Sequence, residues 1–350
     1  MSLPKAYNPL IGLILLAVSA CGDPGGLDVE SSQGAIVGGW AATSDQIFAT
    51  VELRRSGGVR GFCSGVLISP ALVATAAHCA VVEYQEGVIS GAAPGSIEVI
   101  AGHLSATSMD PTMARAVVEV RIHEDYDHDY IMGRSRQGAG KGGIGSPNDL
   151  ALLFLEEPFE GVANAPMLDT VHSETLVRHG DVGFVAGYGT YDVEEDLSGE
   201  LYISDAIIDI LGARELLTRR PDQLGDSCYG DSGGPFYLPT EQGSFLVGLV
   251  SRGRSDVSRD CGDGGVYTLL SAYLPWIERT AGVRFDPRVP AESAAIAFRP
   301  SDSDYVPPSR SDLQRVNACA ASEPGQGSPS LWLMLLGVLV IRRTLSPRRH

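Results

Sequence analysis

The residues best suited to chemistry lie in a glycine-rich stretch of the 350-residue chain, Gly230-Asp231-Ser232-Gly233-Gly234-Pro235. In such a turn the Ser232 hydroxyl can stand clear of other side chains, and neighbouring backbone N–H groups can converge on a developing oxyanion, as acyl transfer requires. Gly, Asp, Ser and Pro also form ordinary turns, so a loop with an incidental serine is the alternative. The stretch favours a nucleophilic serine.

Two upstream segments contain the groups that a serine nucleophile needs. Thr75-Ala76-Ala77-His78-Cys79 offers an imidazole, and Asn148-Asp149-Leu150 offers a carboxylate at the start of an apolar run. Each is ambiguous alone, because a histidine is often a packing residue and Asp149 could close a turn before a buried strand. Their order is more informative, since His78, Asp149, Ser232 is the order of chymotrypsin and not of subtilisins or α/β-hydrolases.

These motifs together resemble those of the trypsin-like serine proteases. The resemblance starts at Ile36-Val37-Gly38-Gly39 and runs to about Thr280, with Tyr273-Leu274-Pro275-Trp276-Ile277 near its end. Several motifs in one order are more specific than any single motif. The resemblance implies an exported serine endopeptidase whose partners are protein or peptide substrates.

The resemblance also implies a role for each catalytic residue. His78 would accept the proton of Ser232 during attack and return it to the leaving amine. Asp149 would accept a hydrogen bond from the other ring nitrogen, which fixes the tautomer and stabilises the imidazolium, as is established for this family. The backbone N–H groups of Gly230 and Ser232 would form the oxyanion hole.

A specificity pocket is implied in the same way. Asp226, six residues before the nucleophile, matches the pocket floor, where a carboxylate favours substrate Arg or Lys through a charge-assisted hydrogen bond. Gly253 and Gly265 match the pocket walls, and Ser251 belongs to the substrate-binding residues. Arg252 stands where trypsins often carry an aromatic residue, so we expect an altered neighbouring subsite. The alternative for Asp226 is a loop cap.

Ile36 matches the residue at which this family is activated by cleavage. The freed ammonium would pair with Asp231 and order the pocket and the oxyanion hole; otherwise, Ile36 merely begins a strand. The residue before it is Ala35, not Arg or Lys. An enzyme specific for Arg or Lys should not cut there readily, so another protease, of unknown identity, or the export machinery is expected to do so.

Short β-rich runs bounded by turn residues recur along the chain and predict sandwiches or closed barrels rather than βα units. The runs are 49–53, 65–68, 96–101, 116–122, 150–155, 183–186, 246–250 and 265–269. The resemblance sharpens this to an all-β fold of two packed Greek-key six-stranded β-barrels with a C-terminal helix near 272–279. The triad would meet in a cleft between the barrels. Residues 127–147 are expected to form a long flexible loop near that cleft.

Composition limits the classes of partner. The chain is 44% hydrophobic, with 42 Gly and 21 Pro, as in a globular β protein. Its net charge of -17 argues against nucleic acid or an anionic membrane surface as the main partner. No cofactor is expected, because residues 138–143 lack the spacing and the ending of a P-loop. No metal is expected, because no calcium-loop acidic pair can be matched. We expect a monomer.

The N-terminal residues 1–20 are predicted to be a signal peptide, with Lys5 ahead of an apolar run from Leu10 to Val18. Val18-Ser19-Ala20-Cys21 resembles the lipobox of bacterial lipoproteins, in which the cysteine is lipidated and becomes the new N-terminus. Residues 21–35 would then be a lipidated or pro-segment. The alternative is an ordinary signal peptide cut near Ala20.

After the predicted protease domain, 36–281, the composition shifts to Pro, Ser, Asp and Arg, which predicts a disordered linker over 282–328. Cys319, an apolar run from Leu331 to Ile341 and an arginine cluster resemble a myxobacterial-type C-terminal sorting tail, with residues 329–350 as its hydrophobic segment. A marginal membrane anchor is the alternative, although a stable membrane helix needs roughly 20 residues. We expect an exported protein of the bacterial cell envelope, held by a lipid on Cys21 or by this tail, or released.

Six cysteines are present, and we assign two of them, Cys21 and Cys319, to the ends that are expected to be processed. The other four would form disulfides in an exported domain: Cys63, Cys79, Cys228 and Cys261. Sequence alone allows three pairings. The resemblance pairs Cys63 with Cys79, and Cys228 with Cys261.

Two other functions compete with the protease. A catalytically silent, surface-anchored binding protein could retain the same fold, although an intact His78, Asp149 and Ser232 disfavours it. An esterase on another fold is disfavoured by the order of the triad and by the missing Gly-x-Ser-x-Gly motif.

Overall fold

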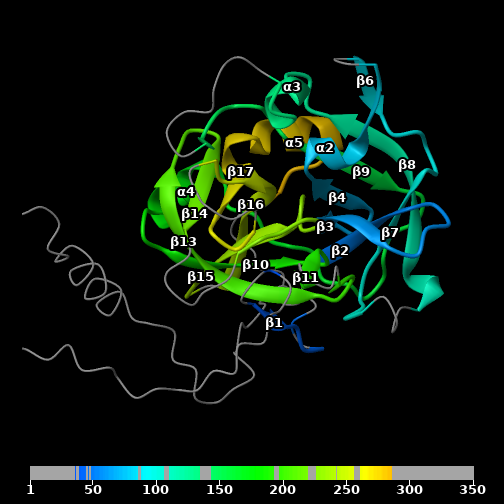
Figure 1. Cartoon of the computed structure of the whole chain (residues 1–350), viewed down its shortest axis with the longest axis horizontal. Helices are drawn as coiled ribbons and strands as arrows, with labels where there is room; N and C mark the ends of the chain where they lie inside the picture. Colours follow the sequence, from blue (N-terminus) through cyan, green and yellow to red (C-terminus); the bar gives the residue numbers. More distant parts are fainter. Residues whose placement is uncertain are drawn as a thin grey trace, which may run out of the picture. The chain divides into compact units, whose positions relative to one another are not determined.

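Two closed antiparallel barrels dominate the described part of the chain (Figure 1). The structure, a computed structural model, describes Ile36 and residues 39–44, 46, 49–85, 88–105, 110–134, 143–192, 197–219, 226–241, 243–255 and 261–285. These residues all belong to the first of two compact units, which ends at Phe298. The fold class expected from the sequence is confirmed.

The first barrel closes through six strands. Going round it, they are β2 (Thr50–Arg55), β3 (Gly61–Ser69), β4 (Leu72–Thr75), β9 (Ala151–Leu155), β8 (Ala114–Ile122) and β7 (Ile97–Ile100). Alternate side chains of a strand share one face, and those that point inward here are aliphatic. Val51, Leu53, Val66 and Leu152 are fully buried, and each contributes about 1.5 to 3 kcal/mol on burial.

The second barrel closes in the same way. Its strands, in spatial order, are β13 (Tyr202–Leu211), β10 (Val182–Gly187), β15 (Pro235–Thr240), β16 (Gly243–Gly253), β17 (Gly265–Leu269) and β14 (Glu215–Arg219). Pairing of β13 with β14 completes the ring, and β1 (Trp40–Ala41) adds to the outside of β13. Val185, Ile208, Leu216 and Phe236 are fully buried in its core.

Shorter elements connect the strands. Two hairpins pair β5 (Val81–Gln85) with β6 (Val88–Gly91), and β11 (Thr190–Asp192) with β12 (Leu197–Ser198). The helices are α2 (Ala77–Ala80), α3 (His128–Ile131), α4 (Thr170–Leu176) and α5 (Leu274–Ala281), with 3-10 turns at Pro111–Met113 and Leu270–Ala272. Helix α5 is capped at its C-terminus by Gly282, whose φ of 68° is the left-handed conformation that often follows a helix.

The segment 127–147 differs from the expected flexible loop. Its first part is helix α3, because the Asp127 side chain accepts a hydrogen bond from the Tyr130 N–H and caps the turn. Its last part, from Gly143 onward, is bonded to the second barrel. Residues 135–142 lie outside the described part.

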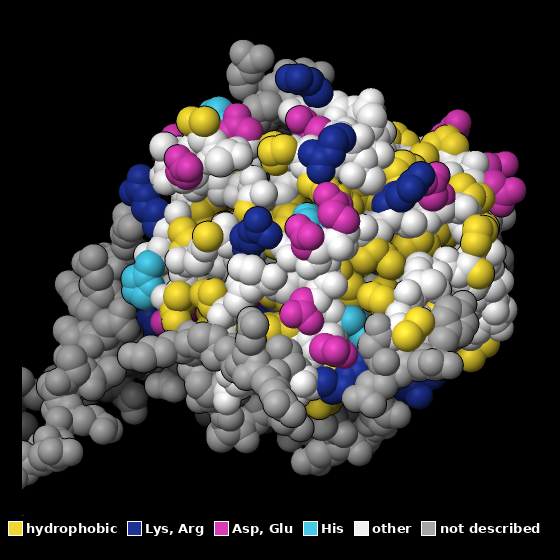
Figure 2. Space-filling view, turned by 90° about the horizontal axis from the view of Figure 1, so that it is seen from above, with side chains coloured by type: hydrophobic (Ala, Val, Ile, Leu, Met, Phe, Trp, Pro, Cys, Tyr) yellow, Lys and Arg dark blue, Asp and Glu magenta, His cyan; other side chains and the backbone are white. Residues whose placement is uncertain are grey.

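Several expectations fall on residues that the structure does not describe. These are the signal peptide, Cys21, the linker from residue 286 onward and the C-terminal apolar run. Within the described ranges, no helix is both long and apolar enough to cross a bilayer. On the face shown in Figure 2, Lys and Arg side chains are scattered among acidic and apolar ones, and the described residues form no basic patch there.

Candidate active site

Strand pairing in the first barrel brings His78 next to Asp149. Thr75, the last residue of β4, pairs with Ala151, the first residue of β9. The chain beyond Thr75 therefore lies beside the residues that precede Ala151. Helix α2 begins two residues later, and the His78 N–H donates to Asp149 Oδ1 at 3.0 Å. The His78 Nδ1 lies 2.9 Å from Asp149 Oδ2.

Asp149 is held from the second barrel as well. Its side chain is fully buried, and Oδ2 accepts a hydrogen bond from the Ser251 hydroxyl at 2.7 Å. The Thr268 hydroxyl donates to the Asp149 backbone carbonyl at 3.0 Å. Burial raises the pKa of Asp149, but the charge and hydrogen bonds of His78 and the hydrogen bond of Ser251 outweigh it, so the pKa is lowered. The carboxylate is therefore ionised at neutral pH.

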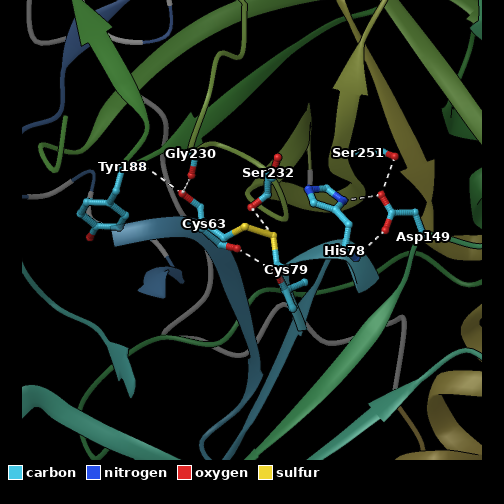
Figure 3. The surroundings of a disulfide bond; sticks show 10 residues. Cys63, His78, Cys79, Asp149, Tyr188, Gly230, Ser232 and Ser251 are labelled. Atoms are coloured by element: carbon cyan, nitrogen blue, oxygen red, sulfur yellow. Dashed lines mark hydrogen bonds and ion pairs between the residues drawn. A yellow bond between two sulfur atoms is a disulfide. The ribbon is translucent and has the colours of Figure 1, made fainter. Parts of the chain in front are cut away.

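The His78 ring lies between Asp149 and Ser232 (Figure 3). An ionised carboxylate only accepts hydrogen bonds, so Nδ1 carries the proton and the lone pair of Nε2 faces Ser232. Burial lowers the pKa of His78, while the Asp149 charge and hydrogen bond raise it further than burial and Arg252 lower it. The ring can thus accept a proton on the side of the serine.

Ser232 is fixed by contacts with the first barrel. Its backbone carbonyl accepts a hydrogen bond from the Ser64 N–H at 2.8 Å. The same oxygen lies 3.6 Å from Cys79 Sγ, which is bonded to Cys63 and has no proton to donate. Gly233 has a φ of 79°, and a Cβ there would collide with Thr75 Oγ1. Glycine is therefore required where the serine turn meets the first barrel.

Two of the backbone N–H groups around Ser232 stand out because no acceptor for them lies in the described part of the chain. The N–H groups of Asp231, Gly233 and Gly234 donate to Cys228, Val250 and Asp231 carbonyls, respectively. Among the described residues, no acceptor bonds the N–H of Gly230 or of Ser232. Gly230 has a φ of 91°, which only glycine adopts readily. These are the two donors expected to form the oxyanion hole.

Asp226, expected at the floor of the specificity pocket, lies next to Gly265, one of the two glycines expected at the pocket walls. Its carboxylate is buried and accepts hydrogen bonds from the hydroxyls of Thr218 and Tyr267 and from Ser227. Burial raises its pKa, although these donors oppose the shift. A Cβ on Gly265 would lie 3.3 Å from Asp226 Oδ1, so a side chain there would crowd the carboxylate.

The remaining predicted pocket residues lie nearby. Gly253 pairs with Gly265 across β16 and β17, and the disulfide Cys228–Cys261 joins the segment after Asp226 to the segment that precedes β17. The hydroxyl of Ser251, which is expected among the substrate-binding residues, donates to Asp149. Both disulfides have the pairing that the family resemblance implies.

Ile36 and Asp231 are both fully buried in the uncut chain. Ile36 packs in the core of the second barrel with a φ of 47°, an uncommon value for a β-branched residue. Asp231 accepts hydrogen bonds from the N–H groups of Gly189 and Cys228. Burial raises its pKa to about 7 despite these bonds. No hydrogen bond joins Ile36 to Asp231 in the described part of the uncut chain.

Sequence reasoning missed the partners that surround these residues. Thr218 and Tyr267 on Asp226 carry no local signal, because they belong to ordinary strand runs. Cys63, His78 and Cys79 have ligand atoms within 4.8 Å of one another, but the two sulfurs form a disulfide and cannot serve as thiolate ligands.

Comparison with known proteins agrees with this geometry. The chain is 26% identical over 257 residues to coagulation factor IX of Cavia porcellus, which covers 69% of this chain and 80% of that protein. The profile of the trypsin family matches residues 36–277, a range that contains both barrels and all three residues of the triad. The chain therefore belongs to the trypsin family.

Proposed function

We propose that this chain is an exported serine endopeptidase that hydrolyses peptide bonds after Arg or Lys through an acyl-enzyme. The observation that carries the proposal is the arrangement of His78 between a buried, ionised Asp149 and Ser232. A structural histidine would not need a fully buried carboxylate on one ring nitrogen and a serine at the other.

In this mechanism Ser232 Oγ attacks the substrate carbonyl while its proton moves to His78 Nε2. The imidazolium that forms is stabilised by Asp149 through Nδ1–H. The N–H groups of Gly230 and Ser232 stabilise the tetrahedral oxyanion, and each such donor is typically worth about 3 to 4 kcal/mol. His78 then protonates the leaving amine. In the second half of the reaction water attacks the acyl-enzyme, with His78 again accepting the proton, and the carboxylic acid product leaves Ser232.

A serine-directed fluorophosphonate probe tests the proposal. Protein purified from the secreting cells should be labelled, and the Ser232→Ala variant should not. The same preparation should hydrolyse short Arg and Lys amides faster than Phe or Ala amides. Absence of labelling in both proteins, at a confirmed Ile36 terminus, would support a catalytically silent binding protein instead.

The preference for Arg or Lys rests on the surroundings of Asp226. It is a buried carboxylate bordered by Gly265, and a guanidinium or ammonium that reaches it would compensate its desolvation. We therefore expect the charged end of a substrate Arg or Lys side chain to bind Asp226.

Activation is proposed to follow cleavage between Ala35 and Ile36. Ile36 already packs in the second barrel with a strained φ, and cutting that bond removes the torsion and creates an ammonium. Asp231 offers a buried carboxylate without a described cation. N-terminal sequencing of active protein tests this, and an active form that still begins at Cys21 would refute it.

Export is consistent with two disulfides, which persist in oxidising compartments. We propose that a lipid on Cys21, the C-terminal segment or both retain the protein at the cell envelope before activation. Cleavage at Ala35 would detach the domain from Cys21, because the described cysteines pair within the domain. In cells that express a chain truncated before Cys319, active enzyme should be released; active enzyme on the membrane would oppose the proposal.

A further inference from the structure

A buried ion pair joins two strands of the second barrel beside the triad. Arg252 of β16 and Glu215 of β14 bond through both ends of the guanidinium, with Nη1–Oε1 at 2.7 Å and Nη2–Oε2 at 3.0 Å. Their side chains are 17% and 1% exposed. Arg252 directly follows Ser251, whose hydroxyl bonds Asp149.

Both members of the pair also hold the chain that leads to Asp149. Arg252 Nη2 donates to the Gly143 carbonyl at 2.5 Å, and the Gly145 N–H donates to Glu215 Oε2 at 2.7 Å. The guanidinium lies over the ring of Tyr130 from helix α3, 5.1 Å from its centroid. The pair therefore touches segment 143–148 at two backbone positions.

The far end of this segment is held from the same side. Asn148 adopts a φ of 53°, and its side-chain oxygen accepts hydrogen bonds from Arg214 at 2.5 Å and from the Tyr273 hydroxyl at 3.1 Å. Arg214 is the neighbour of Glu215. Asp149 thus precedes strand β9 of the first barrel, while residues of the second barrel bond the segment that leads to it.

Stability alone does not account for a buried Arg–Glu pair. Desolvation of both charges offsets much of their attraction, and apolar residues of similar volume are often as good or better. An apolar pair, however, could not bond the Gly143 carbonyl and the Gly145 N–H. These two directional bonds are what the ion pair adds.

We propose that Arg252 and Glu215 are positioning residues that clamp segment 143–148 to the second barrel and thereby fix Asp149 against His78. The inference rests on the proposed proteolytic function. Arg252 also has a second effect, on the charge of His78. Two charged groups act on that ring: Asp149 raises the pKa of His78, and Arg252 lowers it.

Three variants of the full-length chain separate the clamp from its charge. Arg252→Met removes both the bidentate hydrogen bonds to Glu215 and the positive charge. Arg252→Lys keeps the charge but loses the bidentate geometry. The double variant Arg252→Met with Glu215→Met replaces the pair by apolar side chains, so that no buried charge is left unpaired if the single Met variant fails to fold. Arg121→Met, which removes an exposed arginine on β8, is the control.

Catalysis should respond as follows. Arg252→Met and the double variant should lose between about tenfold and a hundredfold in kcat, since small misplacements in an active site have costs of this size. The acidic limb of kcat/KM should move to higher pH in both, because the positive charge near His78 is gone. Arg252→Lys should lose kcat but keep the acidic limb of the wild type. Fluorophosphonate labelling rates should follow kcat.

Hydrogen exchange of the peptide that covers 143–149 gives a readout that does not depend on catalysis. Its amides should exchange about tenfold faster or more in all three variants and at the wild-type rate in Arg121→Met. Wild-type kcat and an unshifted acidic limb in the double variant, or unchanged exchange, would overturn the inference. If the wild-type chain fails to react with the probe, the proposed function fails, and the exchange measurement still decides whether the clamp exists.

Discussion

His78 and Asp149 shift each other's pKa in opposite directions. The pKa of Asp149 is lowered, so its contribution to stability is present above its ordinary pKa and is lost as pH falls through the lowered value. The pKa of His78 is raised, so its contribution is present below its ordinary pKa of about 6.5 and is lost as pH rises through the raised value. The attraction between His78 and Asp149 is thus strongest in mildly acidic solution, where both side chains are charged. The imidazolium present there cannot accept the proton of Ser232.

The acidic limb of kcat/KM should therefore lie above pH 6.5, the ordinary pKa of histidine. Catalysis needs the neutral imidazole, and Asp149 favours the charged form. Measurement of kcat/KM between pH 5 and pH 9 on an Arg amide gives the value. Asp149→Asn should move the limb of its residual activity to lower pH; a limb that stays in place would mean that another group controls it.

Asp226→Ser should remove the proposed preference for basic residues. The hydrolysis of Arg amides is expected to fall by about 10⁴-fold relative to Phe amides, because the site would leave a buried cation unpaired. A serine hydroxyl can still bond Thr218 or Tyr267, which bond the carboxylate in the wild type. The labelling rate with a small fluorophosphonate should stay unchanged. An unchanged ratio of the hydrolysis rates of Arg and Phe amides would show that Asp226 does not determine substrate specificity.

At the scale of elements, the turn that carries Ser232 is one of the contacts between the barrels. Gly233→Ala would place a methyl group against Thr75 Oγ1 and near the Ser64 carbonyl, at a φ of 79°. Backbone strain of this kind costs about 1 to 3 kcal/mol, and the collision adds to it. We expect a lower free energy of unfolding and loss of fluorophosphonate labelling.

Urea unfolding and labelling rates check this expectation. Gly91→Ala is the matched control, because the atoms nearest to its methyl group would belong to Val120 and Ile122, at ordinary contact distances of 3.5 Å or more. Equal labelling rates in Gly233→Ala and Gly91→Ala would contradict the assignment of this turn as the inter-barrel contact that fixes Ser232.

Which elements the sequence reveals depends on whether their signal is local. Motifs around His78, Asp149 and Ser232 predict three elements that do meet, and the runs that became β8, β9 and β17 were found by their apolar residues. The apolar pattern does not predict strand β15, because the strand begins with one proline and contains a second. It does not predict β13 either, because Asp205 and Asp209 break the apolar run.

The partners of the site residues could not be predicted for a different reason. Glu215 and Arg252 are far apart in the chain, and they meet because only β17 lies between their strands. The glycines of residues 127–147 predict a flexible loop, because glycine carries no signal for the contacts that Gly143 and Gly145 make.

At the scale of the whole molecule, the uncut chain contains a buried carboxyl with a raised pKa. Burial, and to a lesser extent Asp226, raises the pKa of Asp231 to about 7. The protonated form contributes stability below its ordinary pKa of 3.8, and this contribution is lost as pH rises through about 7. A shift of this size corresponds to about 4 kcal/mol.

Uncut protein should therefore become less stable between pH 5 and pH 8, and Asp231→Asn should remove most of that change. Urea unfolding in a Ser232→Ala background, which prevents self-cleavage, measures it, with exposed Asp125→Asn as the control. In protein cut before Ile36 the new ammonium would lower the pKa of Asp231, and stability would fall toward acid instead. The same pH dependence in cut and uncut protein would rule out the proposed pairing.

Residues of the second barrel bond Asp149 of the first barrel. Proton transfer through His78 therefore depends on how the two barrels pack against each other. A small slip along their interface would part Asp149 from Ser251 and Ser232 from Ser64 while each hydrophobic interior stayed intact. On gradual heating or in mild denaturant, turnover should therefore vanish before either half melts.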